Sequence, residues 1–260
     1  GPIRNALAWY SLSGDTLTRQ HGATRLALYS PLINAAAELN MQAMQDTLDW
    51  MTQHIAPYRG TQLSLLAMPD MGANGYALPQ LILIYHRVGF RAEPSADAGF
   101  DQRYRRAVHE TAHQWFGHDI GNGVLADSAF LVESLAKYIE LVLIEQRYGS
   151  TAMQALVEYE RERFALAVRR STEQRSALVD ATASHDLYSR ATLVFAILRQ
   201  QLGDAVISQA LQQLWQQHAY PKTPATSMDF VRALQAQVNP SQQQLIQELL
   251  LGTNNALLLP

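Results

Sequence analysis

The feature that most constrains the fold is a change of hydrophobic pattern near Asp101. Before it, short alternating or apolar runs predict strands at about 24–29, 63–68 and 81–85. Between the first two, Met44, Leu48 and Met51 recur on one face and predict a helix over about 32–56 whose methionine stripe packs in the core. After Asp101 the helical period dominates, and we expect helices at about 102–117, 128–147, 151–169, 187–202, 204–218, 227–237 and 240–250. The pattern predicts an α+β fold, with a small sheet-containing lobe followed by a mainly helical lobe.

Charge and cysteine content exclude several classes of site. The 260 residues carry 20 basic and 23 acidic side chains, so the formal net charge is −3. The best basic cluster, residues 103–106, is short, and we expect no nucleic-acid partner. Because the chain has no cysteine, disulfides, thiolate metal sites and cysteine nucleophiles are excluded.

The segment His109-Glu110-Thr111-Ala112-His113 carries the strongest chemical signal. It lies in a predicted helix, where a spacing of four places both imidazoles on one face, close enough to bind one Zn²⁺. Glu110 follows the first histidine and can deprotonate a water at the metal without being a ligand. The alternative is an exposed helix with two surface histidines.

A catalytic zinc site needs a third protein ligand. Nineteen residues separate His113 from Glu133, which is expected near the start of the next helix, facing the histidine pair. His118 is the alternative, as in zinc peptidases with three histidine ligands, but Phe116 and Asp119 do not fit their register. Glu140 lies too far along the helix to be the natural ligand.

Longer motifs resemble the aminopeptidase N-like family of gluzincin zinc metallopeptidases. The run His-Glu-Thr-Ala-His-Gln-Trp-Phe-Gly at 109–117 is similar to its zinc helix, and 133–140 is similar to the helix with its third ligand. Residues 188–203 and 66–70 resemble two further segments of the family. The resemblance implies a thermolysin-like catalytic domain that binds one Zn²⁺ per chain and hydrolyses peptides, most simply as an aminopeptidase.

The same resemblance implies roles for individual residues. His109, His113 and Glu133 would hold zinc, and Glu110 would act as general base and then as proton donor to the leaving amine. Tyr188 would donate its hydroxyl to the developing oxyanion. His185 competes for this role, because a histidine fills it in the related thermolysin-like endopeptidases.

Two departures from the family leave the specificity open. The spacing between His113 and Glu133 is one residue longer than is usual in the family and equals that of thermolysin-like enzymes. The substrate strand of the family carries a glutamate that binds the free amine, whereas residues 68–78 contain no glutamate, and Asp70 is the nearest carboxylate. Gly75, Tyr76 and Ala77 could still offer backbone to an extended peptide. A gluzincin endopeptidase and a non-catalytic peptide-binding scaffold therefore remain alternatives.

The organisation expected is a single catalytic unit excised from a larger protein. Residues 1–118 would form the first lobe, ending in the zinc helix, and 119–260 the helical lobe. The chain opens Gly1-Pro2, which is typical of an expression-tag scar. No apolar stretch reaches the roughly 18 residues of a membrane span, and no signal peptide is visible, so we expect no membrane contact by this fragment. The compartment stays unknown.

Overall fold

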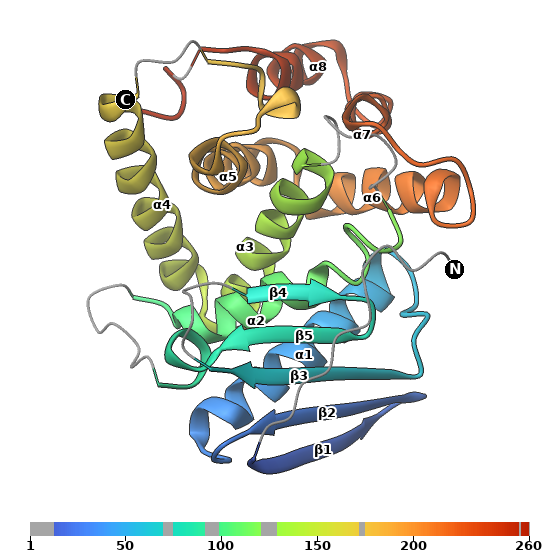
Figure 1. The fold of residues 1–260 in the computed structure, drawn as a ribbon. Coiled ribbons are helices and arrows are strands. Elements are labelled where there is room, and N and C mark those ends of the chain that lie inside the picture. The colour runs from blue at the N-terminus through green and yellow to red at the C-terminus, as the bar shows by residue number, and fades with distance from the viewer. Residues whose placement is uncertain are drawn as a thin grey trace.

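The computed structural model describes residues 13–69, 75–91, 99–120, 129–171, 175–254 and 256–259. The sheet, with α1 (Ala35–His54) behind it, occupies one half of the molecule, and α3 to α8, within residues 135–246, occupy the other half (Figure 1). This arrangement confirms the predicted α+β fold, in which the sheet belongs to the first part of the chain and the second part is mainly helical.

The sheet has five strands in the order β1-β2-β3-β5-β4. Their bounds are Asp15–His21 for β1, Thr24–Ser30 for β2, Gln62–Met68 for β3, Gly75–Leu78 for β4 and Leu81–Tyr85 for β5. The central strands β2, β3 and β5 are parallel, whereas the outer strands β1 and β4 are antiparallel to their neighbours. In Figure 1, β4 is the strand nearest the helical half, so its free edge lies beside the helices that follow.

Strand β1 was not predicted, and its burial explains why. It lies at the outer edge of the sheet, and none of its seven residues is fully buried. It pairs with β2 through a turn at Gly22 and Ala23. An exposed edge strand has no strong alternation of apolar and polar residues, so the periodicity signal is weak.

Helix α1 (Ala35–His54) packs against both β2 and the next helix. Asn34 caps it by accepting a hydrogen bond from the Ala37 amide at 3.0 Å. Met44, Leu48 and Met51 are almost completely buried, which confirms the predicted core stripe. α1 therefore forms the support on which the histidine-bearing helix lies.

That helix, α2, spans Gln102–Ala112 and ends five residues earlier than predicted. The chain leaves the helix in a tight turn, where the Gly117 amide donates to the Ile120 carbonyl at 2.8 Å and Gly117 has a φ of 113°. Trp115 is fully buried and its indole N–H donates to the Ala56 carbonyl at 2.9 Å. This anchoring of the tail onto the end of α1 replaces the last predicted turn of helix.

The helical half contains six α-helices among the described residues. They are α3 (Leu135–Tyr148), α4 (Ser150–Arg170), α5 (Ala191–Leu202), α6 (Asp204–His218), α7 (Ser227–Gln235) and α8 (Pro240–Ile246). Gly149 and Gly203, both at positive φ, end α3 and α5. π-helical turns at Phe130–Ser134 and His185–Arg190 precede α3 and α5, and further ones lie at Arg87–Arg91 and Gln247–Leu251. A short 3₁₀ turn lies at Leu178–Asp180.

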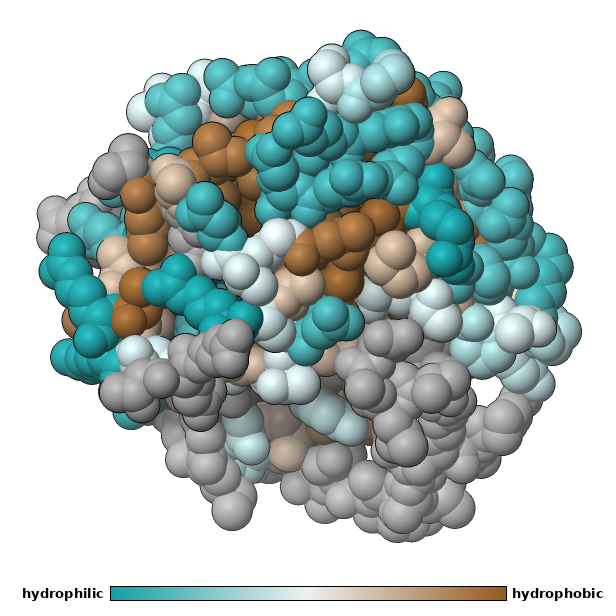
Figure 2. All heavy atoms as spheres, turned by 90° about the horizontal axis from the view of Figure 1, so that it is seen from above, coloured by the Kyte–Doolittle hydropathy of each residue, from teal (hydrophilic) through white to brown (hydrophobic). Residues whose placement is uncertain are grey.

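The helical end presents a largely polar surface. In Figure 2, teal polar side chains cover much of this face, and brown apolar side chains appear in separate patches between them. None of the described helices is long and apolar enough to cross a membrane. The core lies between the sheet, α1, α2 and the helices of the second half.

Candidate metal centre

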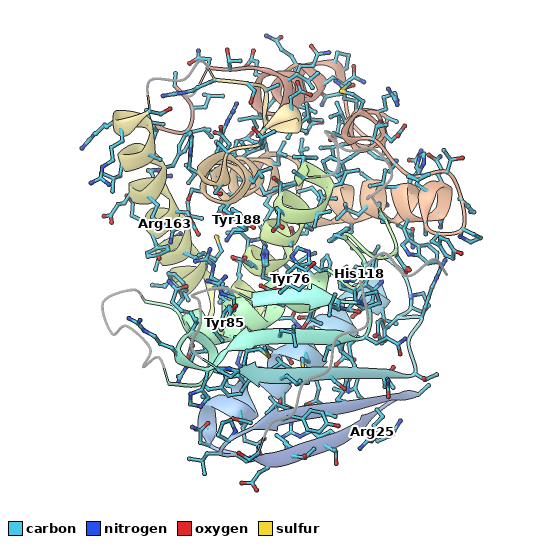
Figure 3. All side chains as sticks on the ribbon, in the orientation of Figure 1. Arg25, Tyr76, Tyr85, His118, Arg163 and Tyr188 are labelled. Carbon is cyan, nitrogen blue, oxygen red and sulfur yellow. The ribbon has the colours of Figure 1, made fainter. Side chains whose placement is uncertain are left out.

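A cleft of about 1480 Å³ runs over one face of α2. The lining residues from α2 and its C-terminal cap follow the helical repeat: Gln102, Arg105, Arg106, His109, Glu110 and the cap residue His113. β4 borders the cleft on the sheet side. Figure 3 shows Tyr76 of β4 and Tyr188 between the sheet and the helical half, whereas Arg25 lies near the far edge of the sheet.

Three side chains converge at the middle of this face. Nε2 of His109 lies 3.1 Å from Oε2 of Glu133, and Nε2 of His113 lies 3.7 Å from the same oxygen. One potential ligand atom from each of the three residues lies within 4.8 Å of the others. Two imidazole nitrogens and one carboxylate, with a fourth side open to the cleft, form the donor set of a catalytic zinc site.

Both histidines are oriented through their second ring nitrogen. Nδ1 of His109 lies 2.7 Å from Oε1 of Glu140, and Nδ1 of His113 lies 3.1 Å from the Phe116 carbonyl oxygen. These contacts favour a proton on Nδ1 of each ring, so Nε2 is the nitrogen whose lone pair can bind a metal ion beside Glu133. The tight turn after α2 thus serves the site, because it brings the Phe116 carbonyl under His113.

The electrostatics of the centre favour a cation. Burial alone would lower the pKa of His109, but its hydrogen bonds to Glu133 and Glu140 outweigh this and raise the pKa to about 9. Burial lowers the pKa of His113 to about 4. The carboxylates that retain a proton on His109 would equally favour a metal ion there, and metal binding would displace the proton.

Glu140 belongs to a buried ionic cluster beneath the centre. It pairs with Arg105 and Lys137, and these same two cations also pair with Glu160. Ser189 donates to Oε2 of Glu160 at 2.6 Å. Burial would raise the pKa of both carboxyl groups, but the two cations hold the pKa of Glu140 well below its ordinary value and that of Glu160 at about 2. Glu140 is therefore kept ionised as the acceptor for His109.

Glu110 lies next to the convergent donors and is almost completely buried. Burial raises its pKa to about 7, although His109 and Arg106 act in the opposite direction. A carboxyl group with a pKa near neutrality can both accept and return a proton. Strand β4 approaches it closely: a β-carbon at Gly75 would collide with Oε1 of Glu110.

Tyr188 completes the group from the helical side. It lies on the π-helical turn before α5, its hydroxyl hydrogen-bonds to Glu133, and its ring centroid is 5.7 Å from that of His109. Burial, and then the neighbouring Glu133, raise the pKa of Tyr188, so the phenol stays a neutral donor. The structure does not place His185 beside the histidine pair. Its Nε2 lies 3.7 Å from Oδ2 of Asp186, and His185 is not among the described residues that line the cleft.

The wall formed by β4 is held in place by Gln114. Its Nε2 donates to the Leu78 carbonyl at 3.0 Å, and its Oε1 accepts from the Gln80 amide at 2.8 Å. Gly75, Tyr76 and Ala77 line the cleft, and Tyr76 is 57% exposed. Asp70 lies outside the described residues, and β4 itself has no carboxylate.

Comparison with known proteins identifies the family. A profile of the peptidase family M1 domain matches residues 39–250. The chain belongs to peptidase family M1. It is 28% identical over 144 residues to endoplasmic reticulum aminopeptidase 2 of Homo sapiens, an alignment that covers 54% of this chain and 14% of that protein.

Solved M1 structures share the fold of this chain. The M1 zinc metallopeptidase from Deinococcus radiodurans is similar with a TM-score of 0.66 at 18% identity, over 92% of this chain and 52% of that one. A form of it bound to a Tyr-Ser-Ala substrate matches equally well. The chain therefore spans about half of these structures and a small part of the human relative.

Membership of M1 implies zinc as the cofactor, and the donor set described above fits that ion. The structure brings together five residues that sequence analysis singled out: His109, Glu110, His113, Glu133 and Tyr188. It places Gly75, Tyr76 and Ala77 along the cleft.

Two residues of this M1 site were missed as functional residues. Glu140 was considered only as a metal ligand and was judged too far along the helix. Gln114 was noted only as part of the motif at residues 109–117. The sequence did contain a signal for Glu140. That residue follows Glu133 by seven residues, which is about two helical turns, so both side chains are expected on the same helix face. No local signal could show that Gln114 bonds to the turn between β4 and β5, since that contact joins residues 34 and 36 positions apart.

Proposed function

We propose that this chain is the catalytic unit of a zinc-dependent peptidase. The observation that carries the proposal is the convergence of His109, His113 and Glu133 beside a buried Glu110 whose pKa is about 7. In this proposal the lobes 1–118 and 119–260 act as one unit, because the first supplies the histidines and the second supplies Glu133 and Tyr188.

The proposed chemistry assigns zinc to His109, His113 and Glu133. When bound, zinc would supply Lewis-acid catalysis, which acidifies a water molecule and polarises the scissile carbonyl. Glu110 would take a proton from the attacking water and return it to the nitrogen of the leaving amine as the C–N bond breaks. Its raised pKa suits both steps, because the group is a usable base and a usable acid near pH 7.

Two further elements would act on the substrate. The neutral hydroxyl of Tyr188 would donate a hydrogen bond to the carbonyl oxygen as negative charge develops on it. The edge of β4 at Gly75, Tyr76 and Ala77 would pair with the backbone of an extended peptide. Gln114 would act as a positioning residue, since it ties this strand to the helix that carries Glu110.

Aminopeptidase action is the leading form of the proposal, in line with the name of the human relative. Asp70 would then supply the negative charge that binds the substrate amine. Endopeptidase action is the second form, and the observation that favours it is the absence of a carboxylate from β4. Burial of an unpaired ammonium group is costly, so a site without that charge favours blocked or internal segments.

One pair of peptides, identical except for N-terminal acetylation, tests the proposal. Both are incubated with zinc-loaded protein and the products are read by mass spectrometry, with Glu110→Gln as the blank. Stepwise shortening of the free peptide alone indicates an aminopeptidase, and internal cleavage of both peptides indicates an endopeptidase. Absence of any cleavage above the blank would contradict peptidase function and support the scaffold alternative.

A further inference from the structure

Arg106 differs from the other arginines that line the cleft. It lies on the cleft face of α2, one turn before Glu110, and is partly buried. Arg105 and Arg163 both pair with Glu160, and Arg59 pairs with Asp119. Within the part of the chain that the structure describes, Arg106 has no hydrogen bond and no ion pair.

The position of Arg106 leaves its charge directed at the reaction site. It is close enough to lower the pKa of both Glu110 and Tyr188, yet it is not in an ion pair with either. A partly buried cation that has no hydrogen-bonded or ion-paired partner recovers only part of the hydration it has lost. An anion brought by the substrate would supply the missing partner, and a guanidinium group can bind a carboxylate through two parallel hydrogen bonds.

We propose that Arg106 binds a carboxylate group of the substrate, within about two residues of the scissile bond. The distance follows from the helix: four residues at about 1.5 Å each separate Arg106 from Glu110 by about 6 Å, which is about two residues of extended peptide. The carboxylate could belong to an aspartate or glutamate side chain or to the C-terminus of a short peptide. This inference rests on the proposed peptidase function and gives it a substrate class.

Three sets of peptides test this inference. The reference peptide is amidated and neutral, and mass spectrometry locates its cleaved bond. In the second set, glutamine is replaced by glutamate at each of the two positions on either side of that bond. The third set is the reference peptide shortened so that it ends two residues after the cleaved bond. It is prepared once with a free C-terminal carboxylate and once as the amide. The measured quantity is the ratio of kcat/KM between each acidic peptide and its neutral partner.

We expect the wild-type protein to prefer at least one acidic peptide by about tenfold or more. Preference for the glutamate peptides identifies a side chain as the source of the carboxylate, and preference for the free acid identifies the C-terminus. In Arg106→Met the ratio should fall to within about twofold of one, and Arg106→Lys should retain part of it, because lysine keeps the charge without the paired hydrogen bonds. Arg163→Met is the matched control and should keep the wild-type ratio, since Arg163 is already paired.

Three results would overturn the inference: a ratio near one in the wild type, a preference that persists in Arg106→Met, or a preference that Arg163→Met abolishes. An Arg106 that acted only on Glu110 would change acidic and neutral peptides equally and leave the ratio intact. If no peptide is cleaved, the peptidase proposal fails. The ratio of dissociation constants for the same peptide pairs, measured by calorimetry on the zinc-loaded protein, then decides the role of Arg106 by the same criteria.

Discussion

The two walls of the cleft are constructed in different ways. The helical wall consists of α2, α3, α4 and the π-helical turns that precede α3 and α5. It holds a buried and fully paired ionic cluster of Arg105, Lys137, Glu140 and Glu160. The strand wall is β4, whose residues are half-buried or exposed and whose attachment to α2 depends on Gln114. The difference indicates that the helical wall holds the reacting groups rigidly, whereas the strand wall presents mainly backbone to the substrate.

The largest effect is expected where the two walls meet, at Glu110. Glu110→Gln keeps the shape but removes the base, and we expect kcat to fall by about 10²–10⁴-fold. Zinc content, measured by atomic absorption, should stay near one ion per chain, because Glu110 is not among the proposed ligands. A variant that retains wild-type kcat would show that the reaction does not use this carboxylate.

Breaking the ionic cluster tests whether the helical wall depends on full pairing. Glu160→Gln leaves two buried cations with one carboxylate, and we expect a loss of about 3–5 kcal/mol in the free energy of unfolding in urea. Glu158→Gln is the matched control on the same helix: its pair with Arg161 is exposed and is worth about 0–1 kcal/mol. A loss at Glu160 no larger than that of the control would refute the role of the cluster.

The loss of stability in Glu160→Gln, relative to wild type, should depend on pH. The folded-state pKa of Glu160 is about 2, below its ordinary value of 4.5. Its ionised form therefore stabilises the fold above about pH 4.5, and this contribution is lost as the pH falls towards 2. The difference in unfolding free energy between wild type and Glu160→Gln should therefore shrink as the pH falls from about 4.5 towards 2. A difference that grows would contradict the downward direction of the pKa shift of Glu160.

Glu140→Gln tests the link between the cluster and the metal centre. It weakens the acceptor that orients His109, and we expect zinc affinity to fall by about 10–100-fold in a competition assay with a chelator. Glu145→Gln, on the same helix and paired with Arg199, is the control and should bind zinc as the wild type does. Equal affinities for the two variants would place Glu140 outside the support of the metal centre.

The smallest of these effects is expected at the strand wall. Gly75→Ala should force the Glu110 carboxylate to move, because the added β-carbon meets it, and we expect kcat to fall by about tenfold, with a small change in stability. Gly22→Ala, in the hairpin turn between β1 and β2, has nothing within 4 Å of the added carbon and should not change kcat. An unchanged kcat in Gly75→Ala would mean that β4 can move away from Glu110 and accommodate the added β-carbon.

The local features of this chain could be predicted from the sequence, whereas contacts between distant segments could not. The elements with strong periodicity, such as α1 and β3, were predicted, and His109 and His113 were selected because helical spacing is a local property. Glu133 was selected from its expected place at the start of the next helix and from the family resemblance. The exposed strand β1 was missed, α2 was extended through Gly117, and Gln114 was assigned no role. The errors at α2 and Gln114 depend on contacts between segments far apart in the chain, which periodicity does not contain. β1 was missed because an exposed edge strand gives only a weak periodic signal.

The sequence by itself determined the chemistry of this protein: which donors, base and tyrosine are available, and the helical spacing that places two imidazoles on one face. Only the tertiary structure decided how those groups are held. It brought Glu140 to His109, the Phe116 carbonyl to His113, and Gly75 against Glu110, and among the residues that it describes it gives Arg106 no hydrogen bond or ion pair. The physical reason is that side-chain identity and helix geometry are local, whereas burial, pairing and pKa are set by neighbours that only folding brings together.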